Sequence, residues 1–147
     1  MNSLLSFNEL IDAVHGKVVL SDFYKSTFGD LCNFTNVQTD SRNVCEKSLF
    51  VPLVGEFQDG HKYVAGAVES GASVVLINNS EYEKNPSVYD DLCRNKGVLI
   101  ICVENTLHGL QDAAEKYVSK FPNLIKISVT GSSGKTTTKE LLVSVFV

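Results

Sequence analysis

Residues 124–147 read LIKISVTGSSGKTTTKELLVSVFV: an apolar run, a turn with two glycines, and a second apolar run with helical spacing. The first run predicts a β-strand over 124–130, and the second predicts a helix over 136–147. Glycines let a backbone curl so that successive N–H groups converge on phosphate oxygens, and a following helix N-terminus adds partial positive charge. The stretch therefore predicts a nucleotide phosphate loop between a strand and a helix of an α/β protein.

Lys135 follows the second glycine of this turn, and Thr136 follows Lys135. In phosphate loops the lysine neutralises the β- and γ-phosphates, and the hydroxyl coordinates the Mg²⁺ ion that accompanies ATP. Lys135 and Thr136 are therefore the candidate catalytic residues, and Thr136 is also the candidate metal ligand. The candidate ATP-binding residues are Gly131, Ser132, Ser133, Gly134, Lys135, Thr136 and Thr137.

The spacing of the two glycines differs from that of the common phosphate loop. Only Ser132 and Ser133 separate Gly131 from Gly134, whereas the common pattern has four intervening residues. The alternative is a Ser- and Thr-rich turn that merely caps a helix, because both residue types are good N-caps. A Gly-Lys-Thr triplet between a strand signal and a helix signal favours the phosphate loop.

The composition bounds what the protein can be. With 147 residues, 44% of them hydrophobic, the chain has room for one ordinary domain, or a small domain and part of another. A net charge of −4 argues against a nucleic-acid-binding surface. The four cysteines lack a C-x-x-C pair and the three histidines lack metal-ligand spacing, so we expect reduced, mostly buried thiols. Without a secretory signal or membrane-spanning run, a cytoplasmic protein is expected, with no membrane insertion. The oligomeric state stays open, and a monomer is the expectation.

Helix and strand signals alternate along the rest of the chain. A capping box at 6–9 opens a short helix, and further helices are predicted over 61–70, within 81–95, and from a cap at Asn105 or Thr106 to Phe121. Strands are predicted over 18–20, 48–54, 72–77 and 97–103, with Pro52 at a strand end or on an edge strand. This alternation predicts an α/β fold with a largely parallel sheet.

Two separated motifs resemble the Mur ligases, ATP-dependent enzymes that add amino acids to the UDP-linked peptidoglycan precursor. TDSR at 39–42, SLFV at 48–51 and GEFQDGH at 55–61 are similar to the family's uridine-nucleotide-binding N-terminal domain. TGSSGKTT at 130–137 is similar to its short ATP loop, including the two-residue gap. The resemblance implies a small N-terminal Mur-ligase-type α/β domain over 1–104. The first strand, phosphate loop and helix of a truncated parallel-sheet ATP-binding domain would follow over 105–147.

The resemblance also implies a site for the UDP end of the precursor. Ser41 carries a small hydroxyl that can bond uracil or pyrophosphate, although a simple polar turn is the alternative for this tripeptide. Arg42 either donates to a phosphate or ties its loop down through a carboxylate. Phe57 either stacks on the base or plugs the core, and His61 is expected in the first turn of its helix without a catalytic role. The implied UDP-substrate-binding residues are Thr39, Ser41, Arg42, Glu56, Phe57 and Gln58.

Within the family, residues 131–140 are most similar to the members that join D-alanyl-D-alanine to UDP-N-acetylmuramoyl-tripeptide. The diaminopimelate- or lysine-adding members are the alternative. The implied reaction uses ATP and Mg²⁺: the peptide carboxylate becomes an acyl phosphate, which the amine of D-alanyl-D-alanine attacks. Lys135, Thr136 and the loop N–H groups would stabilise the charge that builds up on the transferred phosphoryl group.

The family further uses a glutamate, a modified lysine and a C-terminal domain, all of which would lie beyond residue 147. We therefore expect the chain to be a piece of a longer enzyme, without ligase turnover of its own. A self-standing, non-enzymatic nucleotide-binding module is the competing class. A small kinase or GTPase is disfavoured, because its phosphate loop normally opens the domain.

Overall fold

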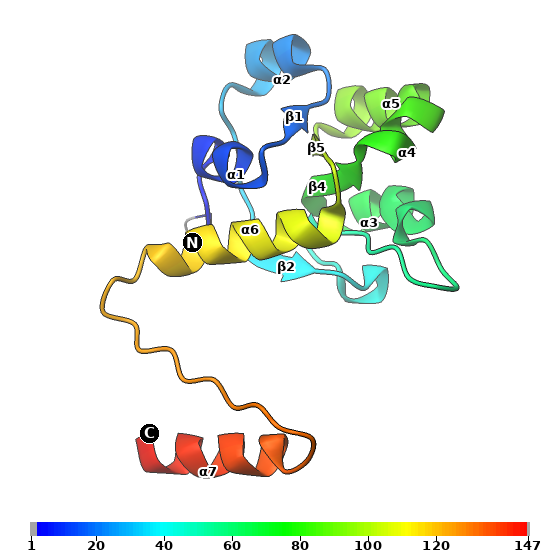
Figure 1. Cartoon of the computed structure of the whole chain (residues 1–147). Helices are drawn as coiled ribbons and strands as arrows, with labels where there is room; N and C mark the ends of the chain where they lie inside the picture. The colour runs from blue at the N-terminus through cyan, green and yellow to red at the C-terminus, as the bar shows by residue number, and fades with distance from the viewer. Residues whose placement is uncertain (1–2, 147) are drawn as a thin grey trace.

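The computed structural model describes residues 3–146 and forms a five-stranded sheet covered by helices on both faces (Figure 1). The strands are β1 (Lys17–Val18), β2 (Asn36–Gln38), β3 (Ser48–Phe50), β4 (Ala72–Asn78) and β5 (Leu99–Val103). The α-helices are α1 (Phe7–Val14), α2 (Ser21–Phe28), α3 (Val64–Glu69), α4 (Asn79–Lys84), α5 (Pro86–Lys96), α6 (Thr106–Ser119) and α7 (Lys135–Phe146). Two short 3₁₀ helices, η1 (Ser41–Asn43) and η2 (Gly60–Tyr63), follow β2 and β3.

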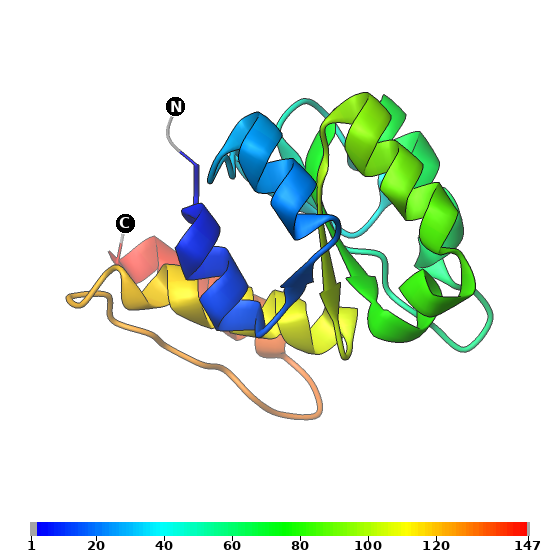
Figure 2. The ribbon, with the colours of Figure 1, turned by 90° about the horizontal axis from the view of Figure 1, so that it is seen from above.

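The strand order is β1-β5-β4-β3-β2, and β2 to β5 run parallel to one another. Among the strands within residues 3–146, β1 alone pairs antiparallel, with β5. Seen from above, α1 and α6 lie on one side of the sheet, and α3, α4 and α5 lie on the other (Figure 2). The predicted α/β class with a largely parallel sheet is confirmed. Because these strands are parallel, the loops that follow β2, β3 and β4 meet at one edge of the sheet.

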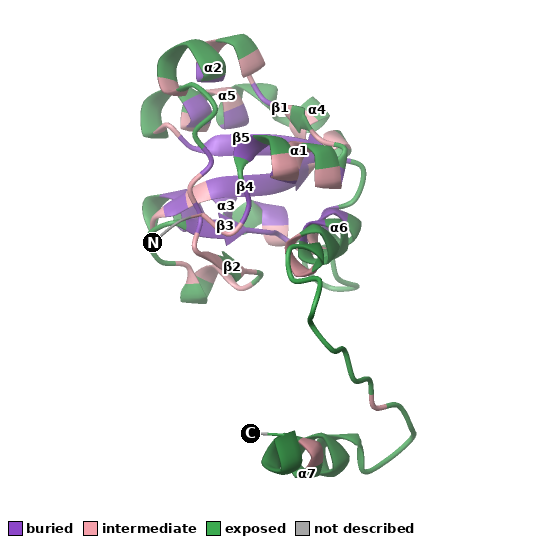
Figure 3. Ribbon diagram, turned by 90° about the vertical axis from the view of Figure 1, so that its left-hand side faces the viewer, coloured by how far each residue is buried: buried purple, intermediate pink, exposed green. Residues whose placement is uncertain are grey.

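The core lies along β4 and β5, whose apolar runs are buried on both faces, as expected for central strands between two helical layers (Figure 3). Pro52 follows the end of β3, so the prediction that it marks a strand end is confirmed. All four cysteines are free thiols. Cys32, Cys93 and Cys102 are buried and Cys45 is exposed, in agreement with the expectation of mostly buried thiols.

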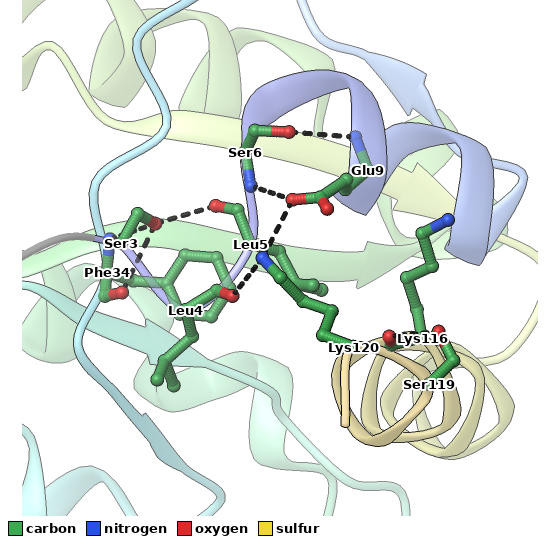
Figure 4. A network of polar contacts seen from close by, with 9 residues as sticks. All are labelled: Ser3, Leu4, Leu5, Ser6, Glu9, Phe34, Lys116, Ser119 and Lys120. Carbon is green, nitrogen blue, oxygen red and sulfur yellow. Dashed lines mark hydrogen bonds and ion pairs between the residues drawn. The ribbon is translucent and has the colours of Figure 1, made fainter. Parts of the chain in front are cut away.

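The predicted capping box at the start of α1 is present. The Ser6 N–H donates to Glu9 Oε2 at 2.8 Å, and the Glu9 N–H donates to Ser6 Oγ at 3.3 Å. Lys120, just after α6, donates through Nζ to the Leu4 carbonyl at 3.3 Å and to Glu9 Oε2 at 3.2 Å (Figure 4). Hydrogen bonds from Ser6, its backbone N–H first, and then the Lys120 ammonium lower the pKa of Glu9 to about 2. This network ties the carboxyl end of α6 to the amino end of α1.

Helix α6 begins where predicted, with the Asn105 side chain accepting from the N–H groups of Leu107 and His108. The helical spacing predicts a buried stripe on α6 made of Leu107, Leu110, Ala114, Tyr117, Val118 and Phe121. The stripe is only partly confirmed: Leu110 and Tyr117 are half-buried against the core, whereas Leu107 and Phe121 are 45% and 48% exposed. The buried residues of the helix are Thr106, Gly109 and Ala113. A Cβ on Gly109 would lie only 3.3 Å from Leu76 of β4, so small residues are needed where the helix approaches the strand closely.

The strand predicted over 124–130 is wrong: within residues 3–146 this segment belongs to no strand. Leu124, Ile125 and Ile127 are all more than half exposed. A strand forms by exchanging backbone hydrogen bonds with a neighbour, and no described segment pairs with this one. Helix α7 is close to its prediction, although Val147, its expected last residue, lies outside the described residues.

Figure 1 shows α7 at the end of an extended connection, apart from the sheet and its helices. None of its described residues is buried. Among residues 3–146, no helix has both the length and the apolar character required to cross a membrane.

Candidate functional site

A cleft of about 430 Å³ lies at the edge of the sheet where β2 and β3 end. It brings together four of the six predicted UDP-site residues, which come from two separate segments of the chain. These four are Thr39, Ser41, Arg42 and Gln58. Asp40, Leu53, Gly60 and Tyr63 complete the lining. The structure therefore brings these four residues together, and their role in binding a nucleotide stays a prediction.

Asp40 and Arg42 fix the wall of the cleft that follows β2. Asp40 caps η1, because its Oδ1 accepts the Arg42 backbone N–H at 3.0 Å. The Arg42 guanidinium also bonds this carboxylate, with Nη2 at 2.6 Å from Oδ2 and Nε at 3.0 Å from Oδ1. The Arg42 side-chain hydrogen bond is the largest influence that lowers the pKa of Asp40 to about 2. Of the two roles considered for Arg42, the structure shows the one that ties down its own loop.

The opposite wall is the loop of residues 52–60, called the wall loop below. Val54 and Asp59 form an isolated antiparallel bridge, and the Gly55 N–H donates to the Gln58 carbonyl at 2.8 Å, which closes a tight hairpin. Glu56 and Phe57 lie at its tip and are not among the residues that line the cleft. Phe57 is 94% exposed, so the core-plug interpretation is wrong, while its stacking role stays a prediction.

Asp59 and His61 repeat the arrangement of Asp40 and Arg42. The two aspartates have nearly identical backbone angles, φ −107° and ψ 118° at Asp40, and φ −106° and ψ 117° at Asp59. Asp59 Oδ1 accepts the His61 backbone N–H at 2.9 Å and lies 2.6 Å from His61 Nδ1. Burial raises the pKa of Asp59, but the His61 hydrogen bonds outweigh that effect and the net pKa is lowered. His61 itself is only 5% exposed.

Tyr63 is a cleft residue that sequence reasoning missed. The apolar pattern over 61–70 predicts that Tyr63 shares one helical face with Val64, but Tyr63 ends the 3₁₀ helix η2 and the α-helix starts at Val64. Tyr63 is 41% exposed in the cleft lining, with the Lys62 ammonium 4.9 Å from its ring centroid. Its position three residues after the Asp59-Gly60 turn is the sequence signal that could have indicated the cleft.

The predicted phosphate-loop residues lie in one turn and in the first turn of α7, well outside the cleft. Gly131 and Gly134 have φ values of 152° and 77°, a region that favours glycine. Lys135 Nζ donates to the Gly131 carbonyl at 2.6 Å, and the Thr138 N–H donates to the Gly134 carbonyl at 3.0 Å. The segment thus has the loop-then-helix form that the sequence predicts, on an exposed part of the chain.

Comparison with known proteins gives one family. A sequence profile described as "Mur ligase family, catalytic domain" matches residues 33–118, which include every residue lining the cleft. The UDP-N-acetylmuramoyl-tripeptide--D-alanyl-D-alanine ligase of Treponema pallidum is 42% identical over 97% of this chain and 29% of its own length. A UDP-N-acetylmuramoyl-L-alanyl-D-glutamate--2,6-diaminopimelate ligase of Clostridium tetani is 33% identical over 75% of this chain and 21% of its own length.

A comparison with solved structures also finds ligases of this kind. The UDP-N-acetylmuramoylalanyl-D-glutamyl-2,6-diaminopimelate--D-alanyl-D-alanyl ligase from Acinetobacter baumannii superposes with a TM-score of 0.69 at 27% identity. The match covers 94% of this chain and 27% of that structure. The chain therefore spans less than a third of the length of the proteins it matches.

Proposed function

This chain belongs to the Mur ligase family, and from that premise we propose that the whole protein adds D-alanyl-D-alanine to UDP-N-acetylmuramoyl-tripeptide. The Treponema relative that is named for this activity is similar over nearly the full chain, which supports the choice. Diaminopimelate addition, for which the Clostridium relative is named, is the second candidate, because that similarity covers three quarters of the chain.

The cleft between η1 and the wall loop is our proposed site for the uridine nucleotide. The observation that carries the proposal is that Ser41 and Gln58, from two separate motifs that the family resemblance assigns to this role, line the same cleft. Its volume of about 430 Å³ is in the range of small-ligand sites. The hydroxyls of Thr39 and Ser41 and the amide of Gln58 offer donors and acceptors for a base or a pyrophosphate. The Nη1 group of Arg42, which does not bond Asp40, adds a charged donor.

ATP and Mg²⁺ fit the residues of the second predicted site. Two glycines at positive φ leave room for close approach of an anion, and they lead into the N-terminus of a 12-residue helix. We propose that the N–H groups of residues 131–137 and the Lys135 ammonium hold the phosphates, and that the Thr136 hydroxyl holds the metal ion. When bound, ATP supplies the phosphoryl group that activates the peptide carboxylate. The chain's own residues bind and orient it and offset its charge.

We also propose that the chain comprises two structural units and that it has no ligase activity on its own. Helix α6 packs on α1 and β4, whereas residues 122–146 lie apart from them, which supports a junction just after α6. The sequence-based boundary at residue 104 would instead place α6 with the second unit. A phosphate loop without a paired strand is not preorganised for catalysis. Product formation by the 147-residue chain would refute this proposal.

Titration with UDP, followed by backbone amide NMR shifts, tests the cleft assignment. We expect saturable shifts around Ser41, Arg42, Gln58 and Gly60. A Gln58→Ala variant should bind more weakly without unfolding, because Gln58 is exposed and its carbonyl bond to Gly55 involves only the backbone. If neither Ser41 nor Gln58 responds to UDP, the nucleotide site is elsewhere.

The choice between the two pairs of acceptor peptide and amine substrate is tested with the whole protein. ADP release is measured with UDP-N-acetylmuramoyl-tripeptide plus D-alanyl-D-alanine, and separately with the UDP-linked dipeptide plus diaminopimelate or lysine. Release only with the first pair supports the proposal, and release only with the second establishes the alternative activity.

A further inference from the structure

The wall loop is anchored near its two ends, where Leu53 packs against the core and several hydrogen bonds are made, and its tip is free of apolar packing. Residues 55–58 are all exposed, so the hairpin tip contributes nothing to the core. At the start of the loop, the Pro52 carbonyl accepts the Thr106 hydroxyl at 2.6 Å. At its end, the Gly60 N–H donates to the Leu53 carbonyl at 2.9 Å, and His61 follows directly. The position of this cleft wall therefore depends on what fixes Pro52 and His61.

His61 connects the end of the loop to the sheet. Its Nε2 lies 3.0 Å from the backbone nitrogen of Asn78, the last residue of β4. A backbone N–H can only donate, so Nε2 is the acceptor and the ring proton resides on Nδ1, which faces Asp59 Oδ1 at 2.6 Å. The geometry requires a neutral ring in the Nδ1–H tautomer.

Asn78 joins the two ends of the loop through one chain of hydrogen bonds. Its backbone N–H is bound by His61, and its side-chain Oδ1 accepts the Thr106 N–H at 2.9 Å. The hydroxyl of Thr106, a residue that is 2% exposed, then reaches Pro52. A continuous hydrogen-bond network thus runs from the half-exposed Asp59 through His61, Asn78 and Thr106 back to the start of the same loop.

We propose that His61 is a positioning residue for the uridine nucleotide, acting by holding the wall loop so that Gln58 and Gly60 face η1 across the cleft. The proposal rests on the nucleotide role given to this cleft above, and it concerns a residue that does not line the cleft itself. In the alternative role, the hydrogen bonds of the buried His61 ring stabilise the fold and have no effect on UDP binding.

Two substitutions separate the two bonds that the ring makes. In His61→Gln the side-chain Oε1 can take the place of Nε2 and accept from the Asn78 N–H. The hydrogen bond to Asp59 is lost, but water can replace it, since the Asp59 side chain is 50% exposed. In His61→Asn the side-chain amide can still donate to Asp59, but the Asn78 N–H loses its acceptor. Val98→Ala is the control, because Val98 is buried at the amino end of β5, away from the cleft.

The experiment measures the UDP dissociation constant, amide hydrogen exchange and the free energy of unfolding for the 147-residue chain and these variants. We expect His61→Asn to weaken UDP binding about tenfold or more and to speed exchange at Asn78, Gly55 and Gly60. His61→Gln should stay within about threefold of the unsubstituted chain, and Val98→Ala should lose stability without weaker binding. In the unsubstituted chain, the ¹⁵N shifts of His61 should show a protonated Nδ1 and an unprotonated Nε2.

Equal UDP binding by all variants would overturn the positioning role, as would a proton on Nε2. A chain that fails to bind UDP at all contradicts the nucleotide assignment instead. In that case exchange at Gly55 and Gly60 still decides whether His61 fixes the loop, because that measurement needs no ligand.

Discussion

Gly60→Ala is the substitution that best tests the geometry of the cleft, with Gly66→Ala as its matched control. A Cβ on Gly60 would lie 2.9 Å from both the backbone N and O of Leu53 and 3.1 Å from Pro52 Cα. A Cβ on Gly66, in the middle of α3, would meet nothing within 4 Å. The same chemical change, six residues apart, should therefore have opposite effects on stability.

The magnitudes follow from the contacts. Ordinary contact begins near 3.4 Å, so the Leu53 backbone must recede by about 0.5 Å, and this strains the Gly60 N–H bond to the Leu53 carbonyl. Crowding of this kind costs about 1–3 kcal/mol, and the reduced freedom of the unfolded chain offsets about 0.4–1 kcal/mol. We expect Gly60→Ala to lower the free energy of unfolding by about 1–2 kcal/mol. Gly66→Ala should raise it by about 0.5–1 kcal/mol, because alanine also favours the helix.

Urea unfolding followed by far-UV circular dichroism measures both values, provided that the slope with denaturant is the same for all chains. A UDP titration of the same samples should show weaker binding only for Gly60→Ala, since only this substitution displaces the wall loop. If the two variants are equally stable, or if Gly60→Ala binds UDP normally, the close approach of Gly60 to Leu53 does not shape the cleft.

Three further predictions concern single contacts. Thr106→Val should cost about 1–3 kcal/mol, because it leaves the Pro52 carbonyl without its buried donor, and a loss below about 0.5 kcal/mol in urea unfolding would contradict this. The folded pKa of about 2 for both Glu9 and Asp40 lies below their ordinary values of 4.5 and 3.8. Their stabilising contribution is therefore complete above those values and lost as the pH falls toward 2. Glu9→Gln should therefore reduce the decline in unfolding free energy between pH 5 and pH 2, which is about the range set by these pKa values. An unchanged decline would show that the Glu9 hydrogen bonds do not stabilise the fold. Phe57→Ala should change stability by less than about 0.5 kcal/mol because Phe57 is 94% exposed, yet weaken UDP binding about fivefold if it stacks on the base, so unchanged binding would remove that role.

The parts of the fold that sequence predicted well are those set by neighbouring residues. The capping box of α1 involves only Ser6 and Glu9, and Asn105 caps α6 by accepting from the two N–H groups that lie two and three residues further along the chain. The buried strands β4 and β5 follow from uninterrupted apolar runs between turn signals. Short polar motifs assigned Ser41 and Gln58 to one site, and both line the same cleft, while their role toward UDP stays a prediction.

The parts that sequence missed depend on distances between segments far apart in the chain. The helical pattern of α6 favoured Leu107 for the core, but the close approach of Gly109 to Leu76 turns a smaller face toward the sheet. Similarly, nothing local to His61 indicates that its Nε2 meets the end of β4. A hydrogen-bond network of this kind is visible only when the elements that it joins have been placed.

The phosphate loop shows why the structure of a short motif can be predicted from its sequence when that of the preceding segment cannot. A helix makes its hydrogen bonds within itself, so α7 follows from its own sequence, whereas 124–130 needs a neighbouring strand to become one. Even α7 is short for a helix that stands alone, and Leu141, Val145 and Phe146 on it are more than 60% exposed. Whatever pairs with 124–130 and covers these apolar side chains would stabilise the elements on both sides of residues 131–134. The affinity of this loop for phosphate should therefore depend on that packing as well as on Lys135 and the loop N–H groups.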